Sequence, residues 1–85
     1  MQTIVREMRG IPLFLLKEYL VELGGSLEGD DRVTGKGWSV RLTRMEPYKL
    51  KSLQVGQTRL DIELDERVAS DFLEQLAMKT LRAGA

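Results

Sequence analysis

With 85 residues, of which 42% are hydrophobic and 31% charged, the chain has the length of one domain, residues 1–85, and is too apolar for a disordered segment. Its 13 basic and 13 acidic residues cancel, whereas a general binder of nucleic acid or of anionic membranes is usually far more basic. Cysteine and histidine are both absent, which excludes disulfides, thiolate metal sites and histidine-based catalysis.

The remaining polar residues form no recognisable catalytic or metal-binding constellation. The serines have no histidine to activate them, and the Asp30-Asp31 pair is more typical of a turn than of a cation site, which needs more oxygen ligands. We therefore expect a protein that is not an enzyme and that needs no metal and no cofactor. Asparagine is missing as well, and with the many charges this gives a composition like that of thermophile proteins.

Nothing in the sequence predicts a membrane or secretory segment. The first ten residues mix charges through the stretch, and the apolar run Ile11–Leu16 is far shorter than the roughly 20 residues that span a bilayer. The prediction is a small soluble, cytoplasmic protein.

The first half of the chain predicts a strand, a helix and a second, confident strand. Thr3–Met8 is rich in β-branched residues, and a helix is expected over 11–23, with Pro12 in its first turn and Gly24-Gly25 as its C-terminal cap. Ser26–Lys36 indicates a weak hairpin or an irregular strand. Trp38–Met45 alternates apolar and polar residues and predicts a half-buried strand with Trp38 in the core.

The second half predicts a loop, a strand and a long helix. The segment 46–56 contains Pro47 and is expected to be loop-like, with a short strand at Leu53–Val55 as an option. Thr58–Leu64 alternates again, and Asp65 is suited to cap a helix that runs to about Arg82. Gly84 is expected to lie past that helix.

These elements predict an α+β fold, a two-layer sandwich in the order β-α-β-β-β-α. Both confident strands carry polar residues on one side, which is typical of an antiparallel sheet with one face in water. We expect three or four mostly antiparallel strands with the two helices packed on one face.

The first predicted helix is more apolar than one packing face requires. On a helical wheel, Phe14 and Val21 fall together, away from the main stripe, and Leu15 lies on a third side. One interpretation is an interface with another protein, most simply a homodimer, or an adaptor surface for a larger partner. The other interpretation is that a segment such as 46–56 folds over these side chains.

The charges are segregated along the sequence. Six basic residues and one acid lie between Arg32 and Lys51, and six acids and one base lie between Asp61 and Glu74. One interpretation pairs these charges across neighbouring strands on a solvated sheet face. The alternative is a site for nucleic acid or a phosphoanion, with these residues as candidates: Arg41, Arg44, Tyr48, Lys49 and Lys51.

Overall fold

The computed structural model describes the chain from residue 1 to residue 84, apart from the side chains of Tyr48, Leu50, Arg82 and Ala83. Five strands and two helices follow one another in the order β-α-β-β-β-β-α. Their bounds are β1 Gln2–Arg9, α1 Leu13–Glu22, β2 Ser26–Glu28, β3 Arg32–Gly35, β4 Trp38–Leu50, β5 Leu53–Leu64 and α2 Glu66–Gly84.

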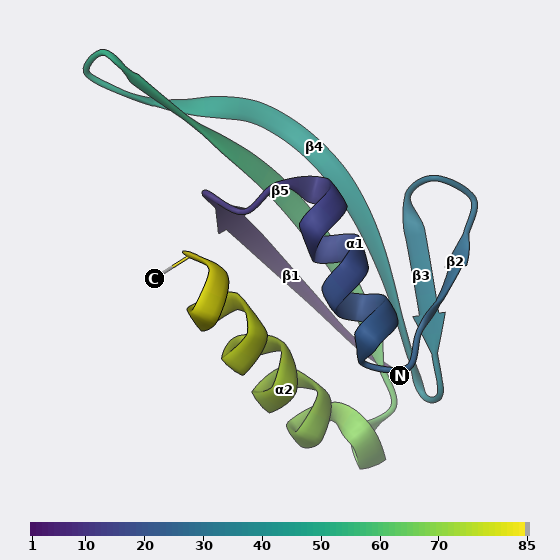
Figure 1. Cartoon of the computed structure of the whole chain (residues 1–85). Helices are drawn as coiled ribbons and strands as arrows, with labels where there is room; N and C mark the ends of the chain where they lie inside the picture. Colours follow the sequence, from purple (N-terminus) through teal and green to yellow (C-terminus); the bar gives the residue numbers. More distant parts are fainter. Residues whose placement is uncertain (85) are drawn as a thin grey trace.

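The strands form one antiparallel sheet in the order β1-β5-β4-β3-β2, and both helices lie on the same side of it (Figure 1). The predicted α+β class is therefore confirmed. The predicted three or four strands are too few, and the predicted order lacks one strand. The additional strand arises because Ser26–Lys36, expected as a weak hairpin or one irregular strand, contains two strands that pair as the β2–β3 hairpin.

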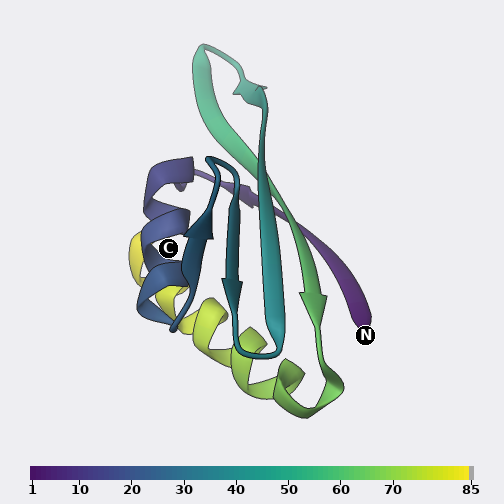
Figure 2. The same ribbon diagram turned by 90° about the vertical axis from the view of Figure 1, so that its right-hand side faces the viewer.

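The second correction concerns the segment 46–56, which was expected to be mostly loop. Instead β4 continues to Leu50 and β5 begins at Leu53, with a register shift between Met45 and Tyr48. Pro47 lies inside this shift, where a strand tolerates a residue without an N–H donor. Beyond Met45 and Gln57 the two strands project from the sheet as a two-stranded ribbon, residues 46–56, which we call the arm (Figure 2).

Helix α1 lies within the predicted range 11–23 but begins at Leu13 and ends at Glu22, so Pro12 is its N-cap and does not lie in its first turn as predicted. The carbonyl oxygen of Pro12 accepts hydrogen bonds from the N–H groups of Leu15 and Leu16, both at 3.1 Å. At the other end, Gly24 takes a positive φ of 101°, and the N–H of Gly25 donates to the Leu20 oxygen at 3.1 Å. This backbone geometry, which favours glycine, reverses the chain into β2.

The core lies between the helices and the inner face of the sheet. The alternating residues of β4 and β5 confirm the predicted inward set, because Val40, Leu60, Ile62 and Leu64 are fully buried and Leu42 is 2% exposed. Helix α1 contributes Leu16 and Leu20, and α2 contributes Phe72 and Leu76. Trp38 is buried as predicted, and its ring lies 4.6 Å from that of Phe72 between centroids.

Helix α2 begins at a charged cap. The Asp65 carboxylate accepts a hydrogen bond of 3.0 Å from the N–H of Arg67, which confirms Asp65 as the capping residue. That bond, followed by the bond from the Arg67 guanidinium, lowers the pKa of Asp65 below its ordinary value. The helix runs through Gly84, so the prediction that Gly84 lies beyond it was wrong.

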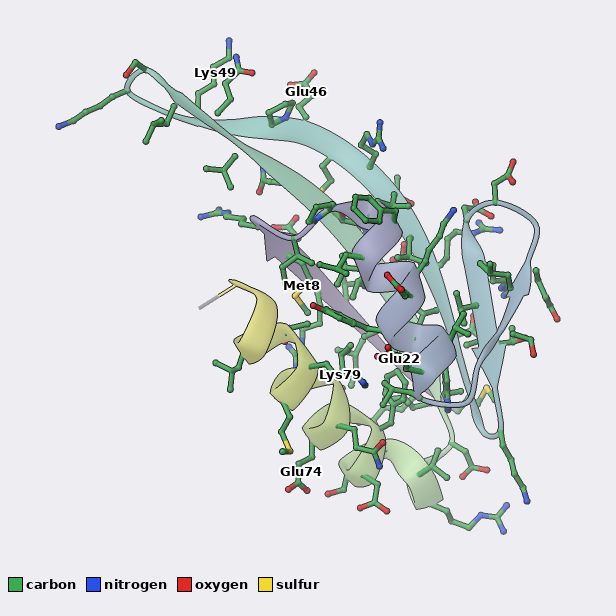
Figure 3. The ribbon with its side chains drawn as sticks, viewed as in Figure 1. Met8, Glu22, Glu46, Lys49, Glu74 and Lys79 are labelled. Carbon is green, nitrogen blue, oxygen red and sulfur yellow. The ribbon has the colours of Figure 1, made fainter. Side chains whose placement is uncertain are left out.

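The two helices are joined by an ion pair between Glu22 and Lys79, with 2.7 Å between Oε2 and Nζ; Figure 3 shows the two side chains directed toward each other. No helix among residues 1–84 is both long and apolar enough to cross a membrane.

Candidate functional site

The outer side of α1 is exposed to solvent. Phe14 is 69% exposed and Val21 is 42% exposed, and they lie seven residues apart on the same side of the helix. Leu15 differs, because it is half-buried and packs against the core. The interpretation in which 46–56 folds over Phe14 and Val21 is therefore wrong: that segment is the arm, and it leaves both side chains in contact with water.

Beside Phe14 lies an apolar groove of about 610 Å³. One wall is the segment from Gly10 to Phe14, which leads into the first turn of α1, and the other is the base of the arm, with Val55 and Met45. Ile11 and Thr58 are almost fully buried among the lining residues, at 5% and 3% exposure. Phe14 thus belongs to both the outer side of α1 and the wall of the groove.

The groove exists because β1 is shorter than its neighbour. β1 pairs with β5 as far as Arg9 opposite Gln57, and the N–H of Gly10 donates a last hydrogen bond of 2.9 Å to the Gly56 oxygen. Gly10 has a φ of 80°, a left-handed conformation that directs the chain away from the sheet toward α1. β5 continues into the arm without a strand on that side, so its edge is open there.

The arm and its base carry positive charge. Arg44, Lys49 and Lys51 are exposed, and none of the described residues forms an ion pair or a side-chain hydrogen bond with them. Glu46 is the acid of this region. Figure 3 shows the Glu46 and Lys49 side chains directed away from the two helices.

The structure separates Arg41 from the other candidate anion-binding residues. Arg41 lies on the open face of the sheet, opposite Asp61 in the β4–β5 register, and its Nε lies 3.9 Å from Asp31 Oδ2. Eight residues along a strand separate it from Lys49, about 26 Å. The side chain of Tyr48 lies outside the described part of the chain.

The open face around Arg41 favours the paired-charge interpretation there. Arg59 contacts Asp61 with 3.1 Å between Nη2 and Oδ1, and a shallow hollow of about 170 Å³ is lined by Arg32, Ser39, Arg41, Asp61 and Glu63. Arg32 lies opposite Arg41 in the β3–β4 register, and Arg41 lies opposite Asp61 in the β4–β5 register, so side chains of both signs border the hollow. The Nε of Arg32 is buried there without a hydrogen-bond partner among the described residues.

The acidic side chains of the described residues do not gather into a metal-binding cluster. Within residues 1–84, no group of three histidine, cysteine, aspartate or glutamate side chains is close enough to hold a metal ion. The groove is lined by apolar side chains, amides, one hydroxyl and the guanidinium of Arg44. This lining is suited to contact with apolar side chains from another molecule.

Sequence reasoning proposed Phe14, Arg44, Lys49 and Lys51 as candidates and missed the groove, which Phe14 and Arg44 line. Its two walls are more than 30 residues apart in the sequence, and only the pairing of β1 with β5 brings them together. The signal that could have indicated it is the combination of Gly10 and Pro12, which ends a strand abruptly beside a longer partner.

No curated protein matches the sequence. A protein-family model, described as archaeal MoaD-like protein, matches residues 4–85. The match covers both helices and all but the first residues of the sheet, so the chain belongs to the family of archaeal MoaD-like proteins.

Proposed function

We propose that this chain is a non-catalytic protein–protein interaction module that associates through Phe14, Val21 and the adjoining groove, with a second copy of itself as the partner. The observation that carries the proposal is the 69% exposure of Phe14 beside an apolar groove. An aromatic side chain held on a helix next to such a groove is typical of an interface, because aromatic residues contribute much of the binding free energy when they are covered.

The small size of the core supports association. A domain of 85 residues buries a smaller share of its surface than a larger one, and covering Phe14 and Val21 in a second copy would add apolar burial to a thin core. A two-fold dimer would use the same surface on both copies, so that assembly would stop at two copies.

Light scattering on the purified protein tests this proposal. We expect the wild type to be a dimer at high micromolar concentration and Phe14→Glu to be a monomer with an unchanged fold. Met78→Glu is the matched control, because Met78 is also exposed, at 53%, but lies on α2 away from the groove. A wild type that stays monomeric, or a dimer that Phe14→Glu leaves intact, would contradict the proposal.

The arm favours a second candidate function, the binding of nucleic acid or another phosphoanion through Arg44, Lys49 and Lys51. A two-stranded ribbon fits the major groove of DNA, and these three cations have no partner among the described residues. Retention on heparin and an RNA gel shift test it: binding must weaken as salt rises and must be lost in Lys49→Glu/Lys51→Glu. Binding that is indifferent to salt would rule it out.

A further inference from the structure

We infer that the acidic β2–β3 turn of one copy docks against the arm of a second copy, with Leu27 entering the groove beside Phe14. This inference rests on the proposed function, and it names the segment of the partner that the groove receives. The acidic turn consists of residues 28–31, with Glu28, Asp30 and Asp31 as its acids.

The first argument is an exposed apolar residue next to the acidic turn. Leu27 lies opposite the fully buried Val33 in the β2–β3 register, so its side chain is on the helix side of the sheet. It lies on the edge strand β2, and Leu27 is 54% exposed there. An aliphatic side chain at an open edge is the complement that an apolar groove requires.

The second argument is charge. The turn brings three acids, all exposed, and the arm with its base brings three cations, Arg44, Lys49 and Lys51, against the single acid Glu46. The net charges are −3 for residues 26–31 and +2 for residues 44–57. Two arms facing each other would instead repel, so the charges select a contact of arm with turn.

The third argument is position. Successive strands of the β2–β5 meander are antiparallel, so the β2–β3 turn and the β4–β5 turn lie at the same end of the sheet, and α1 begins at that end as well (Figure 1). Two copies that meet at this end about a two-fold axis place each arm beside the other copy's acidic turn. The two-fold symmetry then forms the arm–turn contact twice in each dimer, and no arm or turn is left to bind a third copy.

Charge reversal with rescue tests the inference. The arm variant Lys49→Glu/Lys51→Glu and the turn variant Asp30→Lys/Asp31→Lys change exposed residues only, so both should keep the fold. Among the described side chains, the one ion pair that these changes remove is the long Asp31–Arg41 pair at 3.9 Å. Circular dichroism and the urea midpoint of each variant verify that the fold is retained.

Each variant alone should raise the dissociation constant of the dimer by about tenfold or more, because like charges then face each other in both contacts. An equimolar mixture of the two should restore the dimer, since every negative arm then meets a positive turn and every positive arm meets a negative turn. Leu27→Glu should weaken the dimer as Phe14→Glu does. Light scattering of each variant and of the mixture gives all four results.

The outcomes separate this inference from the proposed function. A mixture that is as monomeric as its components overturns the inference, and the proposed function survives if Phe14→Glu still abolishes the wild-type dimer. Dimers that are unchanged in both charge variants and in Leu27→Glu overturn it in the same way. A wild-type monomer overturns both. An RNA that the turn variant binds more tightly than the wild type, with no dimer present, would assign the arm to nucleic acid instead.

Discussion

The same two strands, β4 and β5, form the most buried part of the molecule and its most exposed projection. In the body of the sheet, Leu60 and Ile62 are fully buried under both helices, whereas Leu53 in the arm is 65% exposed. Main-chain pairing across the β4–β5 ladder continues through both parts. The comparison shows that the β4–β5 pairing extends into the arm, and that the ladder forms part of the core only where the helices cover it.

The largest expected difference between body and arm is in the free energy of unfolding. Leu60→Ala should lower it by about 2–5 kcal/mol, because it leaves a cavity under the helices. Leu53→Ala should change it by less than about 0.5 kcal/mol, since the side chain is mostly in water. Urea unfolding of both variants measures the difference. Similar losses would mean that the arm belongs to the cooperative core.

A matched pair of glycine substitutions gives the next largest effect. A Cβ at Gly35 would overlap the ring of Trp38, and Gly35→Ala should cost about 1–3 kcal/mol. A Cβ at Gly56, the last residue of the arm, meets no atom within 4 Å, and Gly56→Ala should be neutral or slightly stabilising. Tryptophan fluorescence during urea unfolding follows both variants. A neutral Gly35→Ala would show that Trp38 can repack.

The smallest effect concerns how the free energy of unfolding depends on acid pH through the Asp65 cap at the start of α2. The bonds from Arg67 lower the pKa of Asp65 in the folded state, so its carboxylate stabilises the fold above the unfolded pKa of about 3.9, and this contribution is lost as the pH falls through the lowered folded pKa. Asp65→Ser keeps a capping oxygen and removes the charge, so it should weaken the decrease in stability below about pH 4.

Urea midpoints between pH 7 and pH 2.5 for the wild type and Asp65→Ser measure this. Identical acid profiles would show that the Asp65 cap does not contribute to the pH dependence of folding.

The same contrast explains what the sequence could predict. Alternation identified the body of β4 and β5, with Trp38, Val40 and Leu60 inward, because a half-buried strand imposes that period on its side chains. The exposed outer side of α1 was one of the two interpretations that the sequence allowed, since a helix has one packing face and Phe14 lies off it. Neither inference needed knowledge of distant contacts.

The arm and the groove were not predictable in this way. Main-chain hydrogen bonds pair the two strands of the arm, and such pairing does not require an alternating pattern of apolar and polar side chains. Pro47 made the segment resemble a loop, because the sequence does not show that this proline lies in a register shift of the β4–β5 pairing. The groove forms because β1 ends near Gly10 while β5 continues. Which strand lies beside β1 depends on contacts between segments about 45 residues apart, and the local sequence pattern does not show them. The sequence therefore proposed Arg44 as a candidate residue but did not predict the groove that Arg44 lines.

The most direct test of association at this end of the molecule is a dilution series of the wild-type protein followed by amide chemical shifts in NMR. We predict shifts that change with concentration at Phe14, Leu27 and Val55, and unchanged shifts at Ser39 and Arg59 on the open face of the sheet. Shifts that stay constant throughout, or that change on the open face instead, would contradict the account.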